Sequence, residues 1–225
     1  MKSFFLSCLF LAPAPLLACD LALVLAVDVS GSVDRAEYRT QMQGLAIALQ
    51  DGIVADALVD QAAKVTLIQW SGSSRQRQTV PWVQINSYTD VVKLSDRIAN
   101  DPRVWRNFST AIGEALGASF EALEDVQDCA RKVIDVSGDG VSNEGEAPQA
   151  FHPRLRVQGV IVNGLAIETD QTDLAAYFYE NLILGEGAFV VTANGFDDYP
   201  AQIKRKLQRE TTKQLSGLVE MSRRR

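Results

Sequence analysis

The chain contains 225 residues, of which 47% are hydrophobic, and its net charge is −6 at pH 7. This length fits one domain with a sizeable core. The charge is uneven, because residues 201–225 carry eight Lys and Arg against two Glu, a balance of +6, and the rest of the chain is acidic. An acidic body argues against nucleic acid as a partner. We interpret the basic segment as a solvated helix end, with contact to anionic lipid or an acidic protein as the alternative.

The N-terminal segment is typical of a secretory signal peptide. Residues 1–18 have one Lys near the start, an apolar stretch too short to cross a bilayer comfortably, and Ala18 just before Cys19. We therefore expect a signal peptide over 1–18, a folded domain over 19–210 and a basic tail over 211–225. The domain would be exported to the periplasm or the cell surface.

The first predicted elements are a buried strand and a helix. The unbroken apolar run at residues 21–29 is typical of a strand that is covered on both faces of a parallel sheet. Asp34, with Glu37 three residues later, forms a capping-box pattern that opens a helix. The apolar stripe of this helix consists of Tyr38, Met42, Leu45 and Leu49.

The rest of the chain continues to alternate between strands and helices. Pro81 cannot donate a hydrogen bond inside a central strand, so its segment is expected to be an edge strand. The alternation predicts a doubly wound α/β fold, with a mostly parallel sheet, one antiparallel edge strand and helices on both faces. Further strands are expected at 64–70, 79–85, 131–138, 157–167 and 187–193, and helices at 90–98, 110–123, 173–182 and 199–218.

Oxygen-bearing side chains gather at the ends of these strands. In such folds, ligands bind beyond the carboxyl ends of the strands. Two carboxylates and three hydroxyls are suitable ligands for a hard cation, most of all Mg²⁺, with Mn²⁺ and Ca²⁺ as alternatives. Weak hydroxyl donors leave the ion able to accept one more carboxylate from outside. The candidate ligands are Asp28, Ser30 and Ser32 in DVSGS, Thr110 before AIGEAL, and Asp139 in DVSGDG.

At these residues the chain resembles the von Willebrand factor type A domain. The hallmark of that domain is the metal-ion-dependent adhesion site, with Asp-x-Ser-x-Ser, a Thr and an Asp on three loops. The resemblance extends from about Cys19 to Arg209. Over this range the chain looks like a secreted bacterial subfamily of such domains whose function is not established. It implies that a protein partner presenting Asp or Glu completes the metal shell. Where many relatives have Gly before the threonine, this chain has Ser109, a bulkier residue that could shift Thr110.

Two cysteines remain beyond the signal segment. Cys19 lies nine residues before Asp28, and Cys129 lies ten before Asp139. If the two strands are parallel neighbours, both cysteines lie at the same end of the sheet, which permits a disulfide in an oxidising compartment. The alternative is a lipoprotein, because LLAC loosely resembles the sequence in which Cys19 would be acylated.

The sequence thus predicts an envelope module that binds protein through a divalent cation, and not an enzyme. A metal-dependent hydrolase and a structural module with an empty site are the alternatives. Ser30 replaces the second acid of an Asp-x-Asp phosphatase, and His152 has no serine that the sequence pairs with it. We interpret residues 142–144 as a solvated loop near the site and Asp34 as a helix cap. The closing helix could offer a second contact surface.

Overall fold

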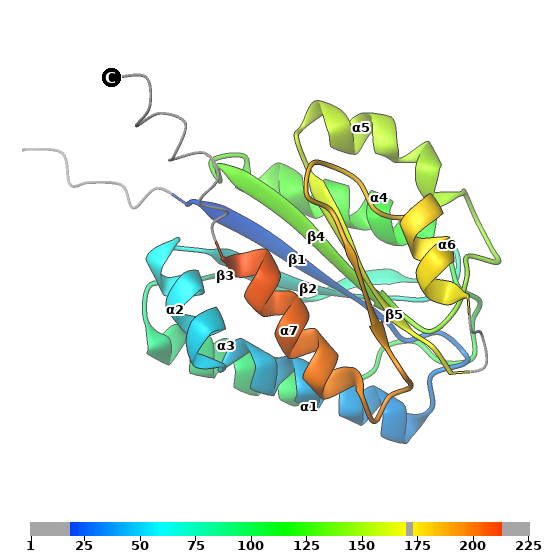
Figure 1. Ribbon diagram of the computed structural model, residues 1–225, viewed down its shortest axis with the longest axis horizontal. Helices are drawn as coiled ribbons and strands as arrows, with labels where there is room; N and C mark the ends of the chain where they lie inside the picture. The colour runs from blue at the N-terminus through cyan, green and yellow to red at the C-terminus, as the bar shows by residue number, and fades with distance from the viewer. Residues whose placement is uncertain (1–18, 170–172, 213–225) are drawn as a thin grey trace, which may run out of the picture.

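A computed structural model describes residues 19–169 and 173–212, which form a six-stranded sheet (Figure 1). The strand order is β3-β2-β1-β4-β5-β6. All neighbouring strands are parallel except β3, which is antiparallel to β2 at the edge. The predicted mixed sheet is therefore confirmed. The strands are β1 (Leu21–Asp28), β2 (Lys64–Trp70), β3 (Gln76–Gln84), β4 (Arg131–Gly138), β5 (Ile161–Ile167) and β6 (Val190–Ala193).

Helices cover both faces of this sheet. In Figure 1, α1, α2, α3 and α7 lie on one side, and α4, α5 and α6 lie on the other. The predicted capping box is present at the start of α1, where Asp34 and Glu37 exchange hydrogen bonds with each other's backbone N–H groups. The helices are α1 (Arg35–Leu49), α2 (Gly52–Asp60), α3 (Tyr88–Ala99), α4 (Ile112–Leu123), α5 (His152–Val157), α6 (Leu174–Asn181) and α7 (Tyr199–Thr211), with short 3₁₀ turns at Glu124–Val126 and Pro148–Ala150.

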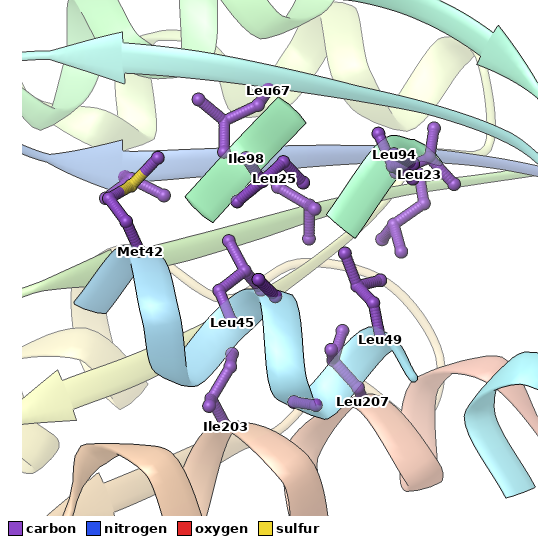
Figure 2. Packing of buried hydrophobic residues seen from close by; sticks show 14 of the residues in the cluster. Leu23, Leu25, Met42, Leu45, Leu49, Leu67, Leu94, Ile98, Ile203 and Leu207 are labelled. Carbon is purple, nitrogen blue, oxygen red and sulfur yellow. The ribbon is translucent and has the colours of Figure 1, made fainter. Parts of the chain in front are cut away.

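The central strand β1 is buried on both faces because successive side chains of a strand point in opposite directions. Leu23 and Leu25 belong to the core cluster on the α1 side, whereas Ala22 and Val24 belong to the cluster on the α4 side. Figure 2 shows the first cluster, in which side chains from the sheet, α1, α3 and α7 meet. The predicted apolar stripe of α1 faces this core.

Two short helices were not expected from the sequence, and several element ends differ. Helix α2 buries only three residues, so it has no long apolar stripe. Helix α5 has six residues and ends at Val157, which was predicted to start a strand but is 89% exposed. Strand β5 begins at Ile161, β6 begins at Val190, and β3 starts earlier than predicted. The final helix is described as far as Thr211, so its predicted extension to residue 218 lies mostly outside the described residues.

The prediction that the last helix has a solvated basic end is wrong for Lys206. Its side chain is fully buried, and its ammonium group forms ion pairs with Asp135 of β4 and, at 2.6 Å, with Glu210 of α7. The guanidinium of Arg209 lies 3.7 Å from the ring centre of Phe189. Some charged side chains of α7 therefore attach the helix to the rest of the domain, while others face solvent.

Cys19 and Cys129 form a disulfide, as predicted, at the amino ends of β1 and β4. This bond uses the sulfur that the lipoprotein alternative would acylate. Across the described residues no single helix has the length and apolar character needed to cross a membrane, although α1 and α2 together, bent by 64°, meet the length and composition criteria.

Candidate metal centre

The five predicted ligands lie at the centre of the carboxyl edge of the sheet. Strands β1 and β4 are parallel neighbours there, and the chain leaves β1 towards α1 on one face and β4 towards α5 on the other. Such a reversal of strand order opens a crevice in which doubly wound folds bind ligands. The DVSGS loop follows β1, Asp139 follows β4, and Thr110 precedes α4.

Hydrogen bonds show that the structure brings the ligands together from all three loops. The hydroxyl of Ser32 donates to Asp139 Oδ1 at 2.7 Å, and the Ser30 and Ser32 hydroxyls lie 3.2 Å apart. Thr110 Oγ1 lies 3.4 Å from Ser30 Oγ. The backbone N–H of Ser30 donates to Asp28 Oδ1 at 2.7 Å, which closes the loop after β1.

Asp28 is the most perturbed group of this cluster. It is fully buried, and Oδ2 has no hydrogen-bond partner within residues 19–169 and 173–212. Burial, and then the nearby charge of Asp139, raise the pKa of the Asp28 carboxyl to about 7. A cation between the two acids would remove this repulsion. The end of β4 lies close to the Asp28 carboxylate because residue 138 is a glycine. A Cβ at Gly138 would lie 3.0 Å from Asp28 Oδ2.

The donor set fits a small hard cation. A buried, unpartnered carboxylate oxygen is costly unless it is hydrogen-bonded or coordinates a metal. The described part of the chain contains no group of three or more His, Cys, Asp and Glu side chains that could hold a metal ion. A cation here would therefore rely on the three hydroxyls in addition to the two carboxylates. Such an all-oxygen set suits Mg²⁺, Mn²⁺ or Ca²⁺ and leaves positions for outside ligands.

Two residues that the sequence did not single out hold the DVSGS loop in place. The side-chain amide of Gln41, buried on α1, donates to the Asp28 carbonyl at 3.1 Å. Arg103 donates to the carbonyls of Val29 at 2.9 Å and Ser30 at 2.8 Å. Gln41 has a weak signal in the sequence, because it is a polar residue beside the apolar stripe of its helix. Arg103 lies in an irregular segment and has no comparable signal.

The loop at residues 142–144 lies near the site and is largely exposed, as interpreted, and it also positions Thr110. The side-chain oxygen of Asn143 accepts a hydrogen bond from the Thr110 backbone N–H at 2.9 Å, and the backbone N–H of Asn143 donates to the Thr110 carbonyl at 2.9 Å. Ser142 Oγ accepts from the N–H of Ile112 at 3.2 Å. These contacts keep Thr110 beside Ser30, with Ser109 before it.

His152 begins α5, away from the serines of the cluster. Its Nε2 lies 3.2 Å from the Leu182 carbonyl oxygen, and burial lowers its pKa. This ring nitrogen therefore contacts the backbone at the end of α6 and not a hydroxyl that it could activate.

A family model described as "Protein of unknown function (DUF1194)" matches residues 18–215. No curated protein matches the sequence. Proximal thread matrix protein 1 from the mussel byssus, solved "with zinc occupied MIDAS motif", has 17% identity and a TM-score of 0.63 over 87% of this chain and 46% of its own.

Two bacterial structures are also similar. A von Willebrand factor type A protein from Catenulispora acidiphila has 15% identity and a TM-score of 0.57, covering 85% of this chain and 42% of its own. The pilus adhesin SpaC from Lactobacillus rhamnosus GG, in an open conformation, has 14% identity and a TM-score of 0.62, covering 85% and 30%. The chain spans less than half the length of these proteins. The likenesses confirm the von Willebrand factor A fold.

Proposed function

The chain belongs to the family described as "Protein of unknown function (DUF1194)", and we propose that it is an exported module that binds a protein partner through a divalent cation. The observation that carries this proposal is the meeting of five oxygen-bearing side chains from three loops, with Asp28 Oδ2 buried and unpartnered among the described residues. A bound cation would coordinate Asp28 Oδ2, which has no hydrogen-bond partner among the described residues.

The metal shell would consist of both carboxylates and the three hydroxyls, directly or through water. Ser30, Ser32 and Thr110 would contribute weak neutral donors, and Asp28 and Asp139 would balance the charge of the ion. An Asp or Glu of the partner would complete the shell. Mg²⁺ is the favoured ion, since it binds few carboxylates and keeps exchangeable water positions. Zinc in the corresponding motif of the mussel protein supports a divalent cation.

Export to the periplasm or cell surface fits the disulfide, because such bonds persist in oxidising compartments. The proposed signal peptide over residues 1–18 and the basic tail from 213 onward lie outside the described residues. A solved neighbour that is a pilus adhesin supports an adhesive role, although this chain covers 30% of it.

Partner capture in the presence and absence of metal tests the proposal. The chain from Cys19 onward is immobilised, exposed to envelope extract in Mg²⁺ or in EDTA, and compared with Asp139→Ala and with the control Asp96→Ala, an exposed acid on α3. We expect capture only in Mg²⁺, lost with Asp139→Ala and retained with Asp96→Ala. Capture that is equal in EDTA contradicts the mechanism.

The same proteins distinguish the hydrolase alternative. Phosphoester hydrolysis that requires Mg²⁺ and disappears in Asp139→Ala would favour an enzyme. The proposed module should show no difference between the wild type and this variant with p-nitrophenyl phosphate as substrate.

A further inference from the structure

The surface beside the candidate metal centre is rich in arginine. A cavity of about 520 Å³ adjoins Gly31, the residue between Ser30 and Ser32, and its lining includes Arg35, Arg103 and Arg106. We call it the arginine cavity. Arg35 and Arg106 are exposed and Arg103 is half-buried. The cavity and the metal centre therefore share the loop between β1 and α1.

The arginines of this cavity form no salt bridge among the described residues, although Asp34 also lines the cavity. Across residues 19–169 and 173–212, the ion pairs are made by Lys64 and Lys206 and none by an arginine. Burial, and then the charge of Arg106, lower the pKa of Arg103, whereas the charges of Asp28 and Asp34 raise it. Arg103 and Arg106 both line the cavity, so an anion bound there would be attracted by both.

The nearby acids are engaged in capping α1. Asp34 Oδ1 accepts hydrogen bonds from the N–H groups of Ala36 at 2.6 Å and Glu37 at 2.8 Å. Glu37 Oε2 accepts from the Asp34 N–H at 2.6 Å. One carboxylate oxygen of each acid is therefore directed to the backbone of the helix start. The guanidinium groups of Arg35 and Arg106 stay available to an anion from outside.

A second pair of arginines extends the cationic surface along the segment 102–109. The guanidinium of Arg75 lies 4.5 Å from the ring centre of Phe108, and that of Arg77 lies 5.2 Å from the ring centre of Trp105. Phe108 is 41% exposed. This stacking places the charges of Arg75 and Arg77 beside segment 102–109, which also carries Arg103 and Arg106. Thr110 directly follows that segment.

We propose that the arginine cavity binds a second carboxylate of the partner, so that the partner presents an acidic stretch of polypeptide. One carboxylate of the partner coordinates the metal ion, and a second carboxylate contacts Arg106 and Arg35. This inference rests on the proposed function, since it assumes a carboxylate on the metal. Guanidinium groups suit the partner because they bind carboxylates in a planar, bidentate way.

A short acidic segment fits this surface better than an extended polyanion. The whole chain carries a charge of −6, which repels a membrane or a nucleic acid as it approaches along the body of the domain. A peptide that covers only the metal and the adjacent cavity meets the local positive charge. Screening limits the repulsion from more distant acids to about 8–10 Å at physiological salt.

Two designed peptides test this proposal on the chain from Cys19 onward. Both are ten-residue Gly/Ser peptides, one with a single Glu and the other with two Glu separated by two to four residues. Binding is followed by NMR titration in Mg²⁺ for the wild type, Arg106→Glu and the control Arg154→Glu, an exposed arginine on the other face. We expect the two-Glu peptide to bind at least about 10-fold more tightly to the wild type and to Arg154→Glu. Arg106→Glu should lose this gain but keep its binding of the single-Glu peptide and of Mg²⁺.

The outcomes separate the cavity from the metal. Equal affinity of the two peptides, with metal-dependent binding of both, overturns the cavity and leaves the proposed function intact. Binding of both peptides that is unchanged in EDTA, or no binding of either at millimolar concentration, overturns the proposed function itself. Tighter binding of vesicles containing anionic lipid, or of single-stranded DNA, with the same loss in Arg106→Glu, overturns the choice of an acidic polypeptide.

Discussion

Replacing Lys206 with Met should strongly destabilise the domain. The Lys206 side chain is fully buried against Asp135 and Glu210, which are 2% and 3% exposed. Met has a similar length and no charge, so Asp135 loses its cation and Glu210 loses its hydrogen-bond donor. Removing one partner of a buried ion pair costs about 3–5 kcal/mol. For a domain of this size, that corresponds to a fall in Tm of about 6–20 °C.

The loss should grow with pH. Burial, and then the charge of Asp135, raise the pKa of Glu210 to about 8, above the ordinary value of 4.5. Between these values the folded state holds a proton that the unfolded state has released, so the stability that this group contributes is complete below about pH 4.5 and is lost as pH rises to 8. Without Lys206, ionisation of Glu210 beside Asp135 costs more still, so the variant keeps this proton to a higher pH than the wild type does. Both folded proteins hold the proton up to about pH 8, so the loss should be similar at pH 5 and pH 7 and should grow above about pH 8, where only the wild type ionises Glu210.

Urea unfolding at pH 5 and at about pH 9.5 in EDTA measures this effect. Lys204→Met is the matched control, because Lys204 lies on the same helix and is exposed. Adding Glu210→Gln to Lys206→Met should recover part of the stability at about pH 9.5, because it removes the acid that must either hold a proton or ionise beside Asp135 without Lys206. A fall in the free energy of unfolding of Lys206→Met by less than about 1 kcal/mol at both pH values, or by no more than in Lys204→Met, would contradict a stabilising role of the buried ion pair.

Three further changes probe the metal centre and the disulfide. Asn143→Ala removes the acceptor for the Thr110 N–H and should weaken Mg²⁺ binding about 10-fold in calorimetry, as loss of an outer-shell contact does; unchanged affinity would show that Asn143 does not position the ligand. Gly138→Ala puts a methyl group 3.0 Å from Asp28 Oδ2 and should weaken Mg²⁺ binding in the same titration, whereas tight binding would show that the strand end yields. Cys129→Ser opens a cross-link spanning 110 residues and should lower the free energy of unfolding by about 4–5 kcal/mol, measured with urea against the oxidised wild type, where equal stability would argue that the bond does not form.

The sheet and the candidate ligands were predictable because their signals are local. The run at residues 21–29 is apolar throughout, and the polar residues that follow it must leave the sheet at its carboxyl edge. Since β1 and β4 are parallel neighbours, Asp28 and Asp139 necessarily end at the same edge. The order of the motifs in the chain was therefore sufficient to place the acids, while the distances between the hydroxyls required the structure.

The supporting contacts were less accessible from sequence. Arg103 acts through backbone carbonyls of a loop that is distant in the chain, and no periodicity marks such a contact. Lys206 was assigned to a solvated end because of the basic residues around it. Its position three residues after Ile203, with Glu210 one turn later, places both charged groups on the buried face of α7. The helical spacing could therefore have predicted that Lys206 and Glu210 are buried, although the basic composition of the segment suggested a solvated helix.

Calorimetric titration of the metal-free chain with Mg²⁺ tests the central claim most directly. The chain from Cys19 onward should bind one ion, Asp28→Asn should bind none, and Asp34→Asn, which changes a helix-capping acid in the same loop, should bind as the wild type does. Equal binding by the wild type and Asp28→Asn would contradict a metal centre built on this carboxylate.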